Sequence, residues 1–105
     1  MPEAPRAAGR PADAVLVAKA GRPHGVRGEI RLLPESGDPG RLLELTRVWL
    51  VAPGDEAARE MAVASARPHQ GVALVRFRGI DTPEAASGLT HAEVWASPDE
   101  LPERA

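Results

Sequence analysis

Glycine and proline interrupt this sequence so often that it has no room for a long helix. The 105 residues include 10 Gly and 11 Pro, and these residues break regular structure more strongly than any others. The segments between them are short and rich in Val, Leu and Ile. This pattern predicts an all-β fold in which short strands are joined by tight turns.

Six of the short apolar segments have strand character. Residues 72–77 alternate, with Val72, Leu74 and Arg76 on one face of the predicted strand. Residues 29–33 also alternate and are followed by Pro34, which cannot donate a hydrogen bond to a neighbouring strand. The six predicted strands are residues 15–18, 29–33, 48–51, 61–65, 72–77 and 94–96. Their close spacing predicts a small six-stranded antiparallel β-barrel.

One or two short helices are expected between the strands. Residues 38–45 offer Asp38 as a helix cap and Pro39 at the first helical position. Residues 81–88 have capping residues, Pro and Glu in the first turn, and Gly88 as a stop. We expect the second helix to close one end of the barrel.

The length predicts a single domain with short extensions. Residues 1–13 are rich in Pro and Ala without apolar periodicity, so we expect a disordered tail. Residues 14–101 form the predicted barrel domain, and residues 102–105 begin a predicted linker.

Several classes of function are excluded by what the sequence lacks. It has no Cys, so disulfides and thiolate metal sites are impossible. The spacing of His24, His69 and His91 does not fit a metal site, and no serine lies in a nucleophile-elbow motif. No apolar run approaches the ~20 residues that span a bilayer, and the N-terminus lacks the apolar core of a secretory signal. We therefore expect a cytoplasmic protein without metal or cofactor.

The charge is unevenly distributed along the chain. Its 13 Lys and Arg against 15 Asp and Glu give a net charge of −2, which excludes binding of nucleic acid through bulk positive charge. Residues 14–80 contain 10 basic and 7 acidic residues (10 − 7 = +3), whereas residues 81–105 contain 1 and 6 (1 − 6 = −5). Local docking on RNA remains possible for the basic part.

Two predicted hairpin loops have similar chemistry. Residues 21–28 contain three Gly, one Pro, two Arg and one His, and residues 67–71 repeat the combination of Arg, Pro, His and Gly. Arginine can bind phosphate or carboxylate through two parallel hydrogen bonds, so two loops at one barrel end would form a basic face. The alternative is that the glycines only turn the chain and the arginines are ordinary surface charges.

The segments that carry these loops resemble the RimM family of bacterial ribosome maturation factors. The resemblance covers residues 17–33, 38–39, 67–71, 77–86 and 97–102. It implies a six-stranded barrel similar to those of translation factors and some reductases. It also implies a second, carboxy-terminal domain of the PRC-barrel type after a linker, outside these 105 residues.

The resemblance further implies a non-enzymatic assembly factor. Such a factor would bind the precursor of the 30S subunit, assist 16S rRNA processing and maturation of the subunit head, and contact the nineteenth small-subunit ribosomal protein. The second domain could carry that last contact. We expect a monomer. The binding residues expected in this sequence are Arg22, Pro23, His24, Gly25, Arg27, Gly28, Arg67, His69 and Gly71.

Two other functions remain open from the residues. The barrel could be a protein-recognition module with little RNA affinity of its own, or, with the least support, a flavin-reductase-like enzyme on a similar barrel. Trp49 and Trp95 lie on predicted strands, where they either pack at the core or rim or provide an exposed anchor for a partner.

Overall fold

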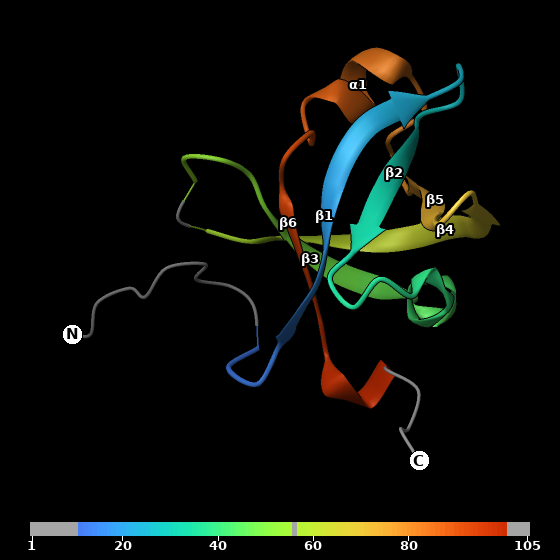
Figure 1. Cartoon of the computed structure of the whole chain (residues 1–105). Coiled ribbons are helices and arrows are strands. Elements are labelled where there is room, and N and C mark those ends of the chain that lie inside the picture. The colour runs from blue at the N-terminus through green and yellow to red at the C-terminus, as the bar shows by residue number, and fades with distance from the viewer. Residues whose placement is uncertain (1–10, 56, 101–105) are drawn as a thin grey trace.

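A computed structural model describes residues 11–55 and 57–100, and its six strands close into an antiparallel barrel (Figure 1). Each strand pairs with the next in the order β1-β2-β5-β4-β3-β6. The strands are β1 (Val15–His24), β2 (Glu29–Pro34), β3 (Arg47–Val51), β4 (Arg59–His69), β5 (Val72–Phe77) and β6 (Glu93–Ala96). The predicted six-stranded antiparallel barrel is confirmed.

The predicted extensions fall largely outside the part of the chain that the structure describes. Residues 1–10 of the predicted tail and residues 102–105 of the predicted linker are not among the described residues. Residues 11–13 form a turn, in which the Ala14 N–H donates to the Pro11 carbonyl at 3.1 Å. None of the helices among the described residues has the length and apolar character needed to cross a bilayer.

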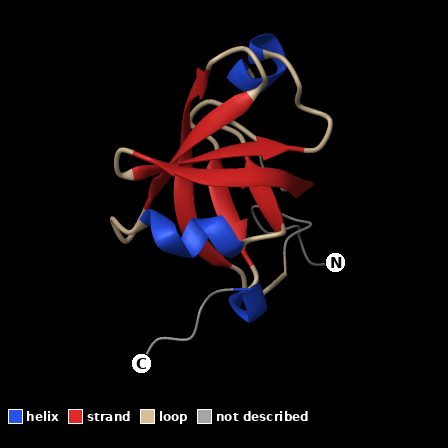
Figure 2. Ribbon diagram, turned by 90° about the vertical axis from the view of Figure 1, so that its right-hand side faces the viewer, coloured by secondary structure: helices blue, strands red, loops and turns tan. Residues whose placement is uncertain are grey.

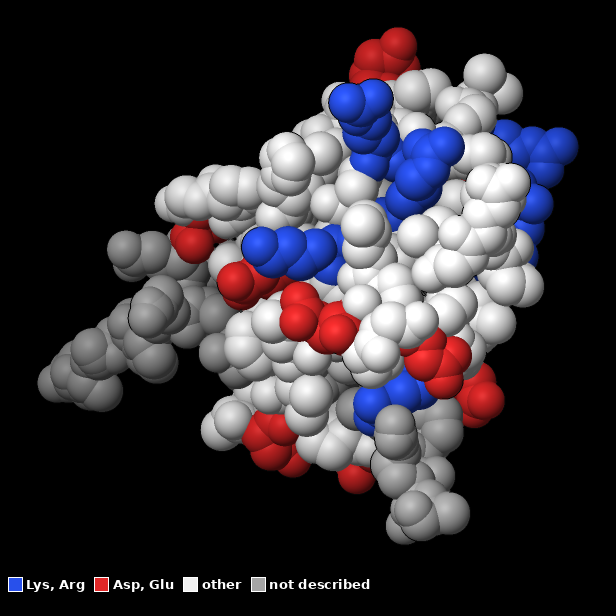
Figure 3. All heavy atoms as spheres, viewed as in Figure 1, with Lys and Arg blue, Asp and Glu red and all other residues white. Residues whose placement is uncertain are grey.

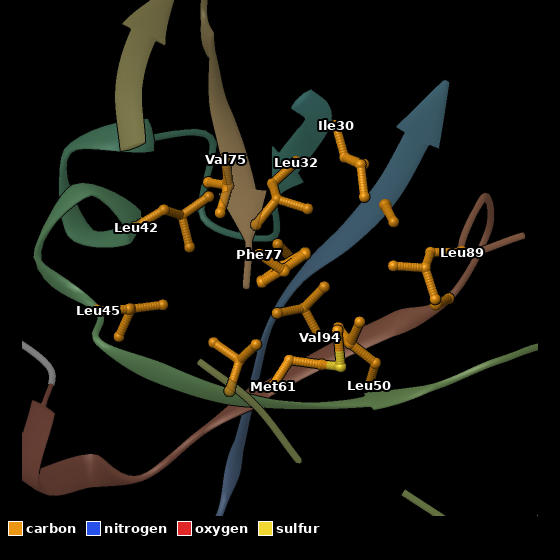
Figure 4. Close-up of a cluster of buried hydrophobic side chains, with 14 of the residues drawn as sticks. Ile30, Leu32, Leu42, Leu45, Leu50, Met61, Val75, Phe77, Leu89 and Val94 are labelled. Atoms are coloured by element: carbon orange, nitrogen blue, oxygen red, sulfur yellow. The ribbon is translucent and has the colours of Figure 1, made fainter. Parts of the chain in front are cut away.

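Alternation along the strands builds the barrel core (Figure 4). Ala73, Val75 and Phe77, which alternate with Val72, Leu74 and Arg76 along β5, point inward, and Phe77 is fully buried. Leu74 is also fully buried but does not belong to the core cluster. It lies on the outer side of β5, opposite Arg31 of β2 and Arg67 of β4.

Two strands are longer than the sequence predicts. The predicted strand 15–18 is β1, which continues to His24, and the predicted strand 61–65 is β4, which continues to His69. Beyond Lys19, β1 has β2 as its only strand partner, because β6 pairs with β1 no further than this residue. Similarly, β3 pairs with β4 no further than Ala62. In this part of the sheet β2 and β5 pair with each other, so β1 and β4 are the outer strands. We call the extended ends of the two hairpins the β1–β2 arm and the β4–β5 arm.

This geometry explains why proline does not end the two long strands. A strand position with one neighbour tolerates the missing N–H of proline. Pro68 lies in the β4–β5 arm opposite Ala73, and Pro23 lies in the β1–β2 arm opposite Ile30. A shift of register between Ala20 and Pro23 precedes this pairing, as expected of a β-bulge.

Three short helices complete the described structure (Figure 2). The first, η1 (Pro39–Glu44), is a 3₁₀ helix capped by Asp38, whose side chain accepts a hydrogen bond from the Gly40 N–H at 2.9 Å. The second, α1 (Pro83–Ser87), is capped by Thr82 and stops at Gly88, as predicted. The third, η2 (Pro98–Glu100), was not predicted.

The two tryptophans lie on neighbouring strands, on the outer side of the barrel. Trp49 of β3 is the register partner of Trp95 of β6, and neither belongs to the core cluster. Trp49 is 5% exposed, with the Arg47 guanidinium 5.0 Å from its ring centroid. The Trp95 Nε1 donates to the Glu93 carboxylate at 3.1 Å. Packing, rather than a free anchor, is the role that the structure shows for Trp49.

Candidate functional site

The turn that joins β1 to β2 contains two glycines in the left-handed backbone region. Gly25 and Gly28 have φ angles of +73° and +87°, where residues with a side chain are disfavoured. Gly28 is also buried, and a Cβ at this position would collide with the carbonyl oxygen of Ile80. Between the glycines, Val26 is 80% exposed. The turn therefore presents Val26 and Arg27 on a fixed backbone.

The tips of the two arms contact each other through histidines. His24, the last residue of β1, and His69, the last residue of β4, have ring centroids 4.9 Å apart and ring planes inclined by 55°. Gln70 and Gly71 form the turn after His69, with φ angles of +52° and +86°. The structure thus brings together the two segments that, if they lay at one barrel end, were expected to form one basic face.

Arg31 of β2 fixes the end of β1. Its Nη1 donates to the Pro23 carbonyl at 3.2 Å, and its Nη2 lies 3.3 Å from Nδ1 of His24. A guanidinium has no acceptor, so this geometry assigns Nδ1 of His24 as the acceptor. Arg31 therefore orients the imidazole that contacts the other arm.

A salt bridge joins the two arms. Arg67 of β4 donates to both carboxylate oxygens of Glu29 on β2, from Nε to Oε2 and from Nη2 to Oε1, each at 3.0 Å. The hydrogen bond from Arg67 is the main reason why the pKa of Glu29 lies below its ordinary value of 4.5, although partial burial opposes the shift. The paired hydrogen bonds fix the geometry as well as the charge.

Ion pairing changes the predicted charge of this region. Arg67 lies in one of the two segments expected to form a basic face, but it is paired with Glu29. Arg76 is paired with Asp81 at 2.8 Å. The exposed arginines near the turn that have no ion pair within residues 11–55 and 57–100 are Arg22, Arg27 and Arg78.

Basic side chains gather over the upper half of the barrel in Figure 3, where the β1–β2 arm lies, and most acidic ones lie below.

Arg27 lies between two surface hollows. Val26 and Arg27 line both of them. The first is completed by His24, Gly25, Glu29 and Arg67, and the second by Arg76 and Asp81. We call the residues around the two arm tips the hairpin surface, and these are Arg22, His24, Val26, Arg27, Arg67 and His69.

The predicted site residues are thus mostly adjacent, but several differ from their predicted role. The sequence placed residues 21–28 in a loop, whereas Arg22, Pro23 and His24 belong to β1. Gly28 contacts the backbone at Ile80, whereas Gly71 lies in the turn between β4 and β5, where a Cβ would have no atom within 4 Å. Within residues 11–55 and 57–100 there is no cluster of three or more His, Asp or Glu side chains suited to a metal ion.

Sequence reasoning missed three residues of the site. Val26 forms the exposed tip, Glu29 receives Arg67, and Arg31 orients His24. A signal for two of them was present, because Glu29 and Arg31 share the outward face of an alternating strand next to the first loop.

Curated relatives of the chain carry a single name. A protein named Ribosome maturation factor RimM from Brucella anthropi is 34% identical over 94 residues, which cover 90% of this chain and 47% of the relative. A protein of the same name from Xanthobacter autotrophicus is 37% identical over 91 residues, covering 87% of this chain and 47% of that protein. The chain therefore spans about half the length of the curated relatives it matches.

Solved structures agree with this similarity. A crystal structure of a 16S ribosomal RNA processing protein RimM from Pseudomonas aeruginosa superposes with a TM-score of 0.74 and 29% identity, covering 89% of this chain and 56% of that one. The solution structure of the N-terminal domain of RimM from Thermus thermophilus gives a TM-score of 0.65 at 22% identity, covering 86% and 95%, and supports the fold. Residues 15–101 match the family model described as the RimM N-terminal domain. The chain therefore belongs to the RimM family, as an N-terminal domain of that family.

Proposed function

We propose that this chain is the particle-binding domain of a ribosome maturation factor. Its hairpin surface docks on the precursor of the 30S subunit and holds the subunit head in a conformation that favours maturation and 16S rRNA processing. Support comes from the names of the curated relatives, which are ribosome maturation factors, and from the name of the Pseudomonas aeruginosa neighbour, which refers to 16S ribosomal RNA processing. In this proposal the protein acts as a monomer in the cytoplasm and performs no covalent chemistry.

One observation carries the proposal. Two exposed arginines without an acid partner among the described residues lie beside and within the turn that joins β1 to β2. Arg22 precedes the turn in β1 and Arg27 lies within it, and neither has an ion pair in the described residues. Gly28 packs the turn against Ile80. The surface is therefore ordered before it binds, which reduces the entropy lost on association.

The charge distribution favours local docking over general attraction to RNA. Because the net charge is −2, long-range attraction to a polyanion is weak. Short-range contacts between phosphates and the fork of an arginine remain favourable. A binder of this kind can favour one conformation of the particle only by its difference in affinity for the competing conformations.

A second candidate function is recognition of a ribosomal protein through the same surface. Val26 favours it, since an aliphatic side chain that is 80% exposed at a turn suits a pocket on a protein. The nineteenth small-subunit ribosomal protein, which the family resemblance implies as a partner, would be the first to test. Its contact could also require the half of the relatives that this chain does not cover.

Co-sedimentation with purified 30S precursors tests the proposal. The variants Arg22→Ala and Arg27→Ala should each weaken binding and lower the slope of log affinity against log salt by about one. The control is Arg59→Ala, an exposed arginine at the other end of β4, which should change neither. Unchanged sedimentation of the double variant would refute docking through this surface, and a flat salt dependence in the unmodified chain would favour protein recognition.

A further inference from the structure

A third hollow lies at the opposite end of the β1–β2 pair from the hairpin surface. It is enclosed by the start of β1, the segment after β2, and η1, and its volume is about 230 Å³. We call it the β1–η1 groove, and its lining residues are Val15, Leu16, Val17, Glu35, Ser36, Asp38, Arg41 and Leu42. The volume is below the roughly 300–1,000 Å³ typical of small-molecule sites, so it suits one or two side chains rather than a cofactor.

The wall formed by β1 is apolar and partly open to solvent. Val15 is 41% exposed, and Leu16 beside it is half-buried. Leu42 of η1 lines the same groove and is only 2% exposed. Exposed aliphatic surface in a concavity gains free energy when an apolar side chain covers it.

Arg41 gives the groove a hydrogen-bond donor that the described residues do not satisfy. Its Nε is buried and has no acceptor, and the structure records no ion pair for its guanidinium within residues 11–55 and 57–100. A buried N–H without an acceptor is unfavourable, and the half-buried side chain of Arg41 leaves part of its guanidinium open to the groove. An oxygen atom from outside the described residues would relieve this.

The rim carries the opposite charge. Glu35 and Asp38 are exposed and have no ion pair in the part of the chain that the structure describes. Two carboxylates against one guanidinium leave the groove with a net negative charge. This repels a phosphate backbone and attracts a cationic group that approaches the rim.

We propose that the β1–η1 groove is a docking site for a basic, apolar segment of a partner protein. An aliphatic side chain covers the wall formed by Val15 and Leu16, and a backbone carbonyl accepts a hydrogen bond from the guanidinium of Arg41. A flanking Lys or Arg of the partner pairs with Glu35 or Asp38. Because this groove and the hairpin surface lie at opposite ends of the β1–β2 pair, a protein segment and a ribosomal particle can be bound together.

Two short peptides with the same apolar centre test the charge preference. The probes are the blocked tetrapeptides Lys-Leu-Val-Lys and Glu-Leu-Val-Glu, titrated into the ¹⁵N-labelled chain and followed by NMR. The basic peptide should shift the amides of Val15, Val17 and Ser36 and the Nε–H of Arg41. The acidic peptide should bind at least fivefold more weakly, because both of its charges face the acidic rim.

Matched variants locate the site. Glu35→Gln should weaken binding of the basic peptide at least threefold, whereas Glu44→Gln, an exposed acid of η1 that does not line the groove, should leave it unchanged. Arg41→Met keeps the aliphatic stem and removes the donor, and it should weaken both peptides. The remaining amide signals report whether each variant keeps its fold.

Four results would overturn the proposal. The first is that neither peptide shifts any amide signal, and the second is that both peptides bind with equal affinity. The third is that only amides of the hairpin surface shift, and the fourth is that an eight-residue uridine oligonucleotide shifts the groove amides. None of these results bears on binding to 30S precursors, which the arginine variants of the hairpin surface test separately.

Discussion

Glu29 and Arg67, 38 positions apart in the sequence, are joined by two parallel hydrogen bonds of 3.0 Å each. This pair is a side-chain contact between the β1–β2 arm and the β4–β5 arm. The Glu29 side chain is 14% exposed, so the carboxylate is well shielded on one side of the pair. Glu29→Gln keeps the shape but removes the charge and one acceptor. We expect the melting temperature to fall by about 2–4 °C, measured by circular dichroism.

Glu60 provides the matched control. Its carboxylate accepts a single hydrogen bond from Arg47 at 3.2 Å, and both side chains are about half exposed. Exposed pairs of this kind contribute little to stability, so Glu60→Gln should leave the melting temperature nearly unchanged. Equal effects of the two substitutions would show that the Glu29 pair does not fasten the arms.

The same pair predicts how stability depends on pH. The pKa of Glu29 in the folded chain is below 4.5, mainly because Arg67 donates a hydrogen bond to its carboxylate. Near this pH the unfolded chain therefore binds more protons than the folded chain. The stabilisation is complete well above pH 4.5 and is lost as the pH falls through the folded-state pKa.

The difference in melting temperature between the unmodified chain and Glu29→Gln isolates this group from the other carboxylates. It should be constant well above pH 4.5 and should shrink as the pH falls below 4.5 and through the folded-state pKa of Glu29. A difference that grows on acidification would contradict the lowered pKa.

Gly28 is the residue of the turn least able to change. Its φ of +87° disfavours any side chain by about 1–2 kcal/mol, and a Cβ would also collide with the Ile80 carbonyl. Forced crowding of this kind adds about 1–3 kcal/mol. Gly28→Ala should therefore lower the urea midpoint strongly and displace Arg27, weakening binding to 30S precursors.

Gly25 separates the two causes. Its φ of +73° is similar, but a Cβ there has no atom within 4 Å. Gly25→Ala should show only the conformational penalty of about 1–2 kcal/mol. If both variants unfold at the same urea concentration, the contact between the turn and Ile80 does not stabilise the chain.

The fold was largely predictable because its strands are separated by strong breakers. Alternation placed Phe77 and Arg76 on opposite faces of one strand, and the caps of η1 and α1 were readable from Asp38 and from the segment before Pro83. The lengths of β1 and β4 were not predictable. Glycine and proline predict an interruption, whereas a strand position with one neighbour tolerates proline.

The position of the candidate site could be expected from the sequence, but the charge of its surface could not. The two Arg, Pro, His and Gly segments have matching chemistry, which suggested one surface, and the contact between His24 and His69 shows that the two segments meet. The pairing of Arg67 with Glu29 joins residues far apart in the sequence. Only the register of β2, β5 and β4 brings them together, and a single sequence does not specify that register.

Val26 distinguishes shape from charge at the hairpin surface. Its side chain is 80% exposed, so Val26→Ser should leave the melting temperature unchanged. If the turn enters a pocket on the 30S precursor, the lost apolar contact should reduce affinity about threefold to tenfold. The salt dependence should keep its slope, since no charge is removed.

Leu33→Ser is the control for Val26→Ser, because Leu33 is 48% exposed on β2 and lies outside the hairpin surface. It should not affect binding to 30S precursors. A loss of affinity that is equal in both variants would mean that general surface hydrophobicity drives association. A loss confined to Val26→Ser, with the salt slope intact, would show that the turn is recognised by its shape. Because the net charge of −2 provides little long-range attraction to RNA, affinity for the particle has to come from such local contacts.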